Sequence, residues 1–537
     1  MGSFVVGVDA TVVNVALPAI ERDLGGGLAG QQWVLNAYLL TLGSLLLIGG
    51  SLGDLFGERR VFVIGVAGFG VGSLLCAAAP TIEVLVVARG LQGISGALLT
   101  PTALALIVAT FESHERSAAI GSWTAWTGIA AVVGPFAGGA LIGIASWRWV
   151  FAVNLPFVAV TLALVSALPG KSMPAQRAKI DIVGAVLCAA GLAGPVFALI
   201  EQPRLGWSSP AVFGSLAGGI ALLVLFVLYE RRTDAPMLEL DLFRRRNFTA
   251  ANIETLFMYA GLSIVFFFLV LFLQQVAGYS AFESGLATLP VTATMFVLSR
   301  RFGQLADRYG THRFMAGGPL VSAVGLLLLI RVDAHPDYVT DLLPPLMLFS
   351  IGLSLTVAPL TATVLADADE HNAGIASGVN TAIARVAGLL GVAAIGAVVA
   401  GLFSTALDDR LEGQPLGSRA RVSVAAAKRQ PLGRVNVRGV PPAEGRAVAR
   451  ASESASTEAF RVGMGIAGGL VLAGGAVGAV AVRDRRRPVR AEECPGGALV
   501  GAPLDVSRSP RWKAPAQRAL AHLRPSEATT SHHGHRS

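Results

Sequence analysis

Long apolar segments recur along almost the whole chain, and they restrict its possible folds more than any other feature. Each is about 20 residues long, enough to cross the ~30 Å hydrocarbon core of a bilayer as an α-helix. Only 14% of the 537 residues are charged and 53% are hydrophobic, which is too little charge to cover a soluble protein of this size. We predict an all-α integral membrane protein with about 14 transmembrane helices, over residues 1–20, 33–53, 61–79, 84–109, 118–143, 149–168, 182–201, 211–229, 248–274, 284–300, 313–331, 342–365, 375–403 and 460–482.

The spacing of these segments divides the chain into six, two and six helices. We expect an N-terminal six-helix bundle at 1–168, two linker helices with a cytoplasmic loop at 169–247, and a C-terminal six-helix bundle at 248–482. The last bundle contains an extracytoplasmic loop at about 404–459, and a cytoplasmic tail follows at 483–537. The loop and the tail are rich in Pro, Gly, Ser and Arg, so we expect both to be mostly disordered.

A short sequence repeat supports two related halves. The motif recurs with identical spacing after 253 residues, as Gly50, Leu52, Asp54 and Gly57 and again as Gly303, Leu305, Asp307 and Gly310. Each copy lies at the end of the second helix of its six-helix group. Two parallel halves related by an axis along the membrane normal would produce this pattern.

The distribution of Arg and Lys predicts the orientation in the membrane, because cytoplasmic loops hold an excess of both. With both ends cytoplasmic, the inner loops carry fifteen basic residues and the short outer loops carry only Arg22, Arg148, Arg204 and Arg331. The outer 404–459 segment is basic as well, but long loops cross membranes largely regardless of charge. The first span leaves eight residues before Asp9, so we also expect residues upstream of Met1.

Three ionisable residues lie inside predicted spans. A buried charge is costly in a bilayer and usually faces a cavity or a partner. Asp9 in the first span could be protonated reversibly or could be a paired structural carboxylate. Arg89 in the fourth span should face a cavity or a carboxylate, unless it reaches the outer surface. Glu254, about six residues into the ninth span, is a second candidate proton or cation site, or pairs with nearby polar groups.

Two glycine-rich motifs suggest moving parts. Gly50 to Arg60 forms a tight turn, with Asp54 and Gly57 followed by Arg59 and Arg60, which could be a conformational latch or only a solvated turn. Asp307 and Arg308 belong to its repeat. In the fifth span, Gly134, Gly138 and Gly139 permit close helix contact and Pro135 bends the helix.

Together these motifs resemble the major facilitator superfamily, in its fourteen-span drug:proton antiporter branch. The resemblance covers roughly residues 4–482. Gly134-Pro135-Phe136-Ala137-Gly138-Gly139 is similar to the antiporter signature of the fifth helix, and Asp9-Ala10-Thr11-Val12-Val13-Asn14 to the first-helix signature. The run from Arg89 and Gln92 to Gly96 is similar to the fourth-helix motif, and Arg385 follows a further match at 374–380. Leu55 and Glu58 depart from the loop signature, which usually has basic residues there.

The resemblance implies the major facilitator fold, two six-helix bundles plus two inserted helices. It also implies proton-coupled efflux of amphipathic drugs or antibiotics, with Asp9, Asn14, Arg89, Gln92, Glu254 and Arg385 as proton-coupling and cavity residues. Proton-coupled uptake on the same fold and a non-transporting scaffold or sensor are the alternatives. The sequence contains no phosphate-binding loop, so we expect no ATPase, enzyme activity, cofactor or metal site. We expect a monomer in the bacterial cytoplasmic membrane, whose partners are protons, lipid and a small organic substrate but not nucleic acid.

Overall fold

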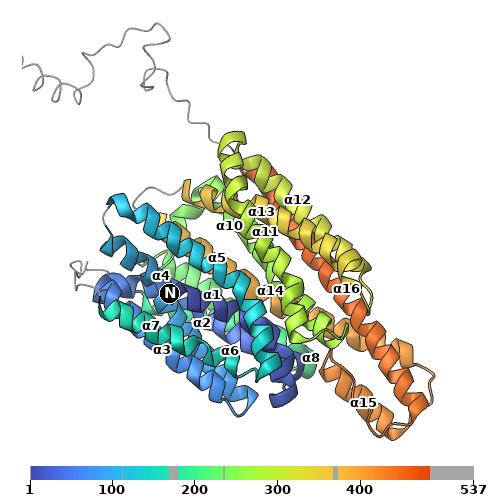
Figure 1. Ribbon diagram of the computed structural model, residues 1–537. Coiled ribbons are helices and arrows are strands. Elements are labelled where there is room, and N and C mark those ends of the chain that lie inside the picture. The colour runs from blue at the N-terminus through green and yellow to red at the C-terminus, as the bar shows by residue number, and fades with distance from the viewer. Residues whose placement is uncertain (1, 112, 168–179, 234–235, 367–372, 484–537) are drawn as a thin grey trace, which may run out of the picture. The chain divides into compact units, whose positions relative to one another are not determined.

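The computed structural model describes residues 2–111, 113–167, 180–233, 236–366 and 373–483, and all regular structure in these ranges is helical. The helices are α1 (Gly2–Leu24), α2 (Gly27–Phe56), α3 (Glu58–Ala78), α4 (Ile82–Thr110), α5 (Ser113–Ile144), α6 (Trp149–Ala152), α7 (Asn154–Ser166), α8 (Ile182–Leu205), α9 (Pro210–Glu230), α10 (Arg246–Gln275), α11 (Ala281–Tyr309), α12 (Thr311–Leu328), α13 (Leu343–Ala366), α14 (Ala373–Leu411), α15 (Ser418–Arg429) and α16 (Pro442–Ala481). Short 3₁₀ turns η1 (Leu240–Arg244) and η2 (Leu329–Arg331) and a π turn η3 (Tyr338–Leu342) complete the described regions (Figure 1).

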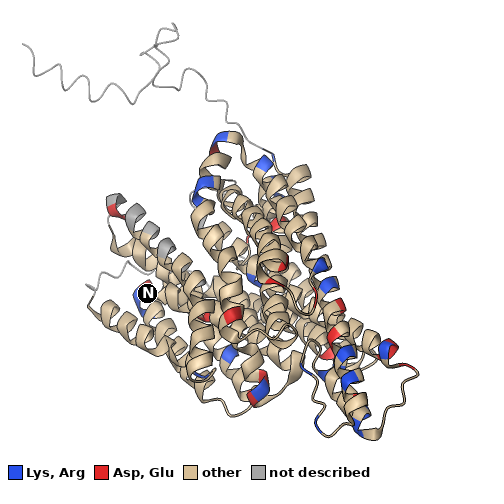
Figure 2. Cartoon of the chain, turned by 45° about the vertical axis from the view of Figure 1, so that its right-hand side comes forward, with Lys and Arg blue, Asp and Glu red and all other residues tan. Residues whose placement is uncertain are grey.

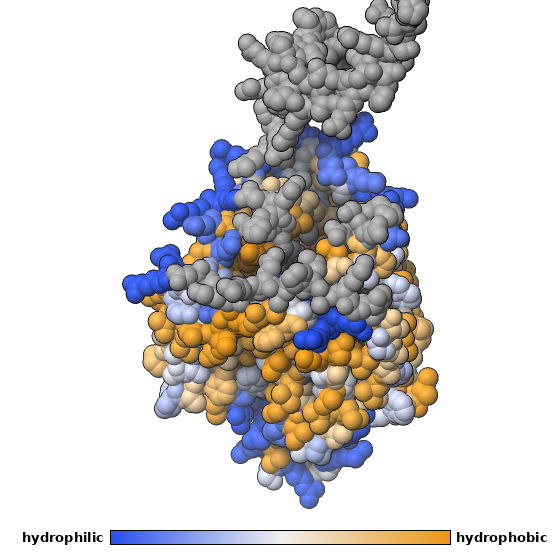
Figure 3. All heavy atoms as spheres, turned by 90° about the vertical axis from the view of Figure 1, so that its left-hand side faces the viewer, coloured by the Kyte–Doolittle hydropathy of each residue, from blue (hydrophilic) through white to orange (hydrophobic). Residues whose placement is uncertain are grey.

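Each predicted span overlaps a helix, except that the sixth, 149–168, overlaps the two helices α6 and α7. In the described ranges, 13 helical segments are long and apolar enough to cross a membrane, with α6 and α7 counted together, and α5 adds the apolar stretch Gly128–Ile144. Charged residues gather toward the ends of the helices (Figure 2), and the face in Figure 3 carries a hydrophobic band between hydrophilic ends. This distribution of charge is the one that a bilayer requires, since its core cannot solvate ions.

The sequence repeat corresponds to a repeat in the backbone. Gly57 joins α2 to α3 at φ +91°, and Gly310 joins α11 to α12 at φ +94°. Both angles lie in the left-handed region, where a side chain is strained and glycine is not. The identical spacing of the two copies therefore places the same sharp turn after the second helix of each group.

Two groups of helices, α1–α7 and α10–α16, pack against each other. We name the two ends of the bundle by the turns there: the Gly25 end, between α1 and α2, and the Gly57 end, between α2 and α3. The groups meet near the Gly25 end, where Gln274 Nε2 donates to the Val15 carbonyl at 3.0 Å and Gln32 Nε2 to the Val392 carbonyl at 2.7 Å. The boundaries of the predicted bundles at 168 and 248 stay a prediction.

Helices α8 and α9 pack against each other, and α8 lies against both α2 and α14. Trp33 Nε1 of α2 donates to Glu201 Oε1 of α8 at 3.0 Å. Much of α9 exposes large apolar side chains such as Phe213, Ile220 and Val224, as expected for a lipid-facing helix. This inserted pair therefore lies beside the α2–α14 contact between the two groups.

The expectation that residues 404–459 are mostly disordered is wrong. Helix α14 continues to Leu411, α15 follows, and α16 begins at Pro442 instead of near residue 460. Buried Val448, Ala451, Ala455 and Ala459 recur every three to four residues, so this polar-looking stretch has an apolar helical face. The predicted tail, apart from Arg483, lies outside the described residues.

Candidate functional site

A polar network lies in the interior of the first helix group, and its centre is an ion pair. Asp9 of α1 and Arg89 of α4 are both fully buried, and Arg89 Nη1 donates to Asp9 Oδ2 at 2.7 Å. Arg89 thus faces a carboxylate, one of the two settings predicted for it, and does not reach the surface. Taking two ions from water costs several kcal/mol each, so such a pair persists only where further hydrogen bonds compensate.

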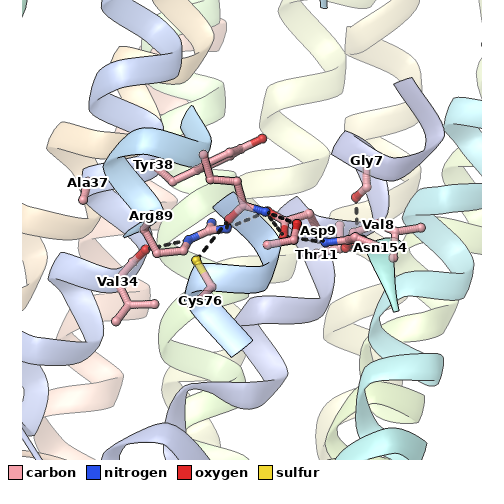
Figure 4. A network of polar contacts seen from close by, with 12 residues as sticks. Gly7, Val8, Asp9, Thr11, Val34, Ala37, Tyr38, Cys76, Arg89 and Asn154 are labelled. Carbon is pink, nitrogen blue, oxygen red and sulfur yellow. Dashed lines mark hydrogen bonds and ion pairs between the residues drawn. The ribbon is translucent and has the colours of Figure 1, made fainter. Parts of the chain in front are cut away.

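Further bonds to the carboxylate come from Gln92 of α4 and from α7, and Ser73 of α3 joins the network (Figure 4). The second carboxylate oxygen, Asp9 Oδ1, accepts from Gln92 Nε2 at 3.0 Å and from Asn154 Nδ2 of α7 at 3.1 Å. Ser73 Oγ of α3 accepts from the same two amides at 2.9 and 3.3 Å. The carboxylate therefore accepts hydrogen bonds from three side chains, those of Arg89, Gln92 and Asn154.

The guanidinium is held equally closely. Arg89 Nε donates to the Val34 carbonyl of α2 at 3.1 Å, and Nη1 also donates to Gln92 Oε1 at 2.7 Å. Its planar group lies over the Tyr38 ring, 4.2 Å from the centroid. Arg89 Nη2 is buried and has no hydrogen-bond partner among the described residues.

Sequence reasoning found Asp9, Arg89 and Gln92 but missed Asn154, Ser73 and Tyr38. A single polar residue in an apolar helix was their only signal in the sequence. Asn14, also predicted, is half-buried on α1 and makes no contact with this network; its Oδ1 has no hydrogen-bond partner among the described residues.

Glu254 and Arg385 lie in the second helix group, and neither forms a hydrogen bond or ion pair with Asp9 or Arg89. Glu254 of α10 is fully buried, and neither carboxylate oxygen has a hydrogen-bond partner in the described ranges. Its side chain points toward Gly474 and Gly478 of α16. Arg385 of α14 lines a separate cavity.

The glycines of α5 contact a different helix on each side. Gly134 and Gly138 face Thr11 and Val12 of α1, and a side chain at either position would overlap them. Gly139 faces α11 instead, where an added Cβ would lie 2.6 Å from the Phe282 Cα. Pro135 also meets α11, at Gly285. Helix α5 therefore connects the helix that carries Asp9 to the second helix group.

The predicted latch residues lie at the Gly57 end. Asp54, Asp307 and Arg308 are exposed, and neither Asp54 nor Asp307 forms an ion pair with a described residue. Arg59 Nη2 donates to the Val165 and Ser166 carbonyls at 2.9 and 3.2 Å, at the C-terminal end of α7. Gly50, which faces Pro101, lies one turn before Asp54, and Arg60 is exposed.

Comparison with known proteins gives the family. Residues 1–392 match the Major Facilitator Superfamily. The puromycin resistance protein pur8 of Streptomyces alboniger is 38% identical over 75% of this chain and 80% of its own length. The probable actinorhodin transporter of Streptomyces coelicolor is 35% identical over 85% of this chain and 85% of its own length. The multidrug resistance protein Stp of Mycobacterium tuberculosis is 35% identical over 77% of this chain and 76% of its own length.

Solved structures agree on the fold. A bacterial homologue of the human lysosomal transporter Spinster, in an inward-facing and unoccupied conformation, aligns with a TM-score of 0.56 at 17% identity over 89% of this chain and 95% of that one. The inward-open xylose transporter XylE of E. coli aligns with a TM-score of 0.55 at 13% identity, over 91% of this chain and 95% of that one. These comparisons confirm the predicted fold class. The relatives named above are drug-resistance and export proteins. The chain is a multi-pass membrane protein of the Major Facilitator Superfamily and belongs to its fourteen-span branch.

Proposed function

We propose that this chain exports amphipathic organic molecules across the bacterial cytoplasmic membrane in exchange for protons. The Gly57 end and both termini face the cytoplasm in this proposal. Its support is the similarity to resistance and export proteins over three quarters of the chain, together with a fully buried carboxylate–guanidinium pair in the first helix group. An ATPase domain is not needed for such exchange, because the proton gradient supplies the energy.

The contacts of Asp9 suggest how a proton is coupled to movement. Protonation removes its negative charge, which leaves Arg89 buried without a counter-ion and weakens all three bonds to the carboxylate. The change acts on α1, α4 and α7 together. Helix α1 also contacts α5 through Gly134 and Gly138 and α10 through Gln274, so a shift of α1 reaches the contacts between the groups.

In this scheme the structure corresponds to the state that is closed outside. The groups are joined at the Gly25 end, and the exposed Asp54 and Asp307 at the Gly57 end are not engaged. When the Gly57 end closes, these loops would form the latch predicted from the repeat. Alternation between the two states moves substrate outward as protons move inward.

The test uses everted vesicles and a compound chosen from a susceptibility panel in an efflux-deficient host. We expect accumulation that needs a proton gradient and is abolished by a protonophore. Asp9→Asn should abolish it, because the amide cannot exchange a proton. Asp23→Asn is the matched control, since Asp23 forms a half-exposed ion pair with Arg148 at 2.6 Å near the Gly25 end.

Two results would contradict the proposal. Uptake into cells under an inward proton gradient would indicate symport instead of efflux. Full proton-driven accumulation by Asp9→Asn would show that Asp9 is not the coupling carboxylate.

A further inference from the structure

A largely apolar cavity of about 330 Å³ lies where the inserted helix pair meets the two groups. We call it the side pocket; its wall includes Leu47 of α2, Cys188 of α8, Phe226 of α9, Leu256 of α10 and Ile383 of α14. A volume of this size is typical of small-molecule sites. The inserted pair therefore supplies part of the wall of a cavity that the other helices would leave open.

Three polar side chains of the side pocket donate to backbone carbonyls, Ser44 and Asn252 within their own helices and Thr249 to the η1 turn. Ser44 Oγ donates to the Leu40 carbonyl at 2.6 Å, Thr249 Oγ1 to the Phe243 carbonyl at 2.5 Å and Asn252 Nδ2 to the Phe248 carbonyl at 2.9 Å. What remains available to a ligand is mainly apolar surface. The side pocket is thus suited to a ring system and not to a charged group.

A second cavity of about 340 Å³, the Arg385 cavity, shares α2, α10 and α14 with the side pocket and is also lined by α13. Its wall includes Tyr259, Ser263, Thr361, Asn380 and Arg385, and Arg385 is the one charged residue of the wall. The guanidinium forms no ion pair or hydrogen bond with any described residue. It therefore keeps its donors free for a ligand.

Two asparagines form the boundary between these cavities. Asn252 lines the side pocket and Asn380 lines the Arg385 cavity, and Asn380 Nδ2 donates to Asn252 Oδ1 at 3.1 Å. Asn380 Nδ2 also donates to Thr255 Oγ1 at 2.7 Å. A single molecule that lies across this boundary would place its apolar part in one cavity and its polar part beside Arg385.

The sign of charge in the two cavities is positive. Neither wall contains an Asp or a Glu. The buried Asp9 already binds three side-chain donors, and Glu254 points to α16 on the other side of α10. Glu230 Oε2 accepts from the N–H of Leu238 in the wall of the side pocket at 3.0 Å, but Glu230 is not itself a wall residue. A cationic ligand beside Arg385 would therefore meet a positive charge with no carboxylate in either wall to balance it.

From this arrangement we infer that the transported molecules combine an apolar ring system with an anionic or acceptor-rich group, and that the inserted pair α8–α9 forms the wall that holds the rings. This inference rests on the proposed efflux function and narrows its substrate class. Arg385 binds the acceptor group, since guanidinium hydrogen bonds to anionic oxygens are strong and directional.

The test compares two probes with the same rings and opposite charges, anthracene-9-carboxylate and anthracen-9-ylmethylammonium. Both are offered to everted vesicles under a proton gradient, and accumulation is followed by fluorescence. Because a neutral amine crosses the bilayer and is trapped as its ammonium in an acidic lumen, accumulation is taken as the difference from vesicles that lack this protein. We expect that difference for the carboxylate and not for the ammonium. Arg385→Gln should reduce transport of the carboxylate about tenfold, the value of one charge-assisted hydrogen bond, with no gain for the ammonium.

The side pocket is tested by filling it. Ala382→Phe places a ring in the pocket and should raise the KM for anthracene-9-carboxylate, while benzoate, which has a single ring, is affected less. Ala217→Phe adds the same ring on the exposed surface of α9 and is the matched control. An equal effect of Ala382→Phe on both acids would contradict the assignment of the rings to this pocket.

The inference and the proposed function fail in different ways. If a compound from the susceptibility panel is exported but the ammonium probe accumulates better than the carboxylate, only the inference is wrong. If neither the panel nor either probe shows protonophore-sensitive accumulation, the proposed function itself is wrong.

Discussion

At the residue scale, the Asp9–Arg89 pair shows that the energetic cost of a buried charge depends on the groups that bind it. Each ion alone would be expensive in a helix bundle, and the two offset each other only because Gln92, Asn154 and Val34 complete their hydrogen bonds. The site is therefore neutral as a unit. In the proposed exchange, one added proton would leave the pair with a net positive charge.

This mutual compensation predicts a double-mutant result. Arg89→Gln leaves a buried carboxylate without its counter-ion and should destabilise the purified protein by about 3–5 kcal/mol. The double variant Asp9→Asn, Arg89→Gln should recover most of that loss, because no unpaired charge remains. Thermal unfolding in detergent measures the free-energy coupling between the two positions.

The control is the pair Asp23 and Arg148, whose side chains are 50% and 37% exposed. Exposed pairs contribute little, so the same cycle there should give a coupling below about 1 kcal/mol. Equal coupling at the two pairs would mean that burial does not set the strength of the Asp9–Arg89 interaction.

Ionisable residues were the part of the site that sequence could predict. Asp9, Arg89 and Glu254 stand out because an ionisable side chain in an apolar span costs several kcal/mol to insert, so it usually has a function or a partner. Asn154 and Ser73 cost far less to bury, and similar single polar residues occur in other spans. Their role depends on which helices lie side by side, and only the folded arrangement shows that.

At the scale of single elements, α5 connects the network to the rest of the molecule. One side of the helix uses Gly134 and Gly138 to approach α1, and the other uses Gly139 to approach α11. The sequence correctly indicates close helix contacts here. It does not reveal that they are made to two helices in different groups.

Enlarging Gly139 should therefore disturb the contact between the groups. In Gly139→Leu the new Cβ would lie 2.6 Å from the Phe282 Cα and 2.7 Å from the Ala281 carbonyl oxygen, which are backbone atoms that cannot move aside easily. We expect the distance between spin labels at the Gly25 ends of α5 and α11 to increase. Gly143→Leu is the control, since nothing lies within 4 Å of a Cβ there; an equal change in both variants would contradict this role of Gly139.

The segment before the last span shows where a composition-based interpretation fails. Residues 442–459 contain many Arg, Ser, Glu and Ala, which is too polar for a transmembrane span, although Ala, Arg and Glu are strong helix formers. Their apolar positions nevertheless follow a helical period, and buried Val448 and Ala455 lie on that face. Periodicity was the better guide to structure in this stretch.

At the scale of the whole molecule, the number and order of the spans could be predicted because bilayer thickness fixes helix length. The repeat at Gly57 and Gly310 indicated two related groups. The relative arrangement of the groups could not be predicted, because the same sequence must support two conformations that differ in which end is closed. Contacts such as Gln274 with Val15 belong to one of them.

The positive Arg385 cavity has a consequence for the energy source of transport. If an anion leaves as a proton enters, both movements carry positive charge inward, so each cycle moves two charges across the membrane. One charge is worth about 2.3 kcal/mol per 100 mV, so the membrane potential alone should drive export. We expect proteoliposomes given a potassium diffusion potential, positive on the side that corresponds to the exterior, to transport anthracene-9-carboxylate without a pH gradient. Reversing the potential should stop the export, and indifference to voltage would contradict a one-for-one exchange of anion and proton.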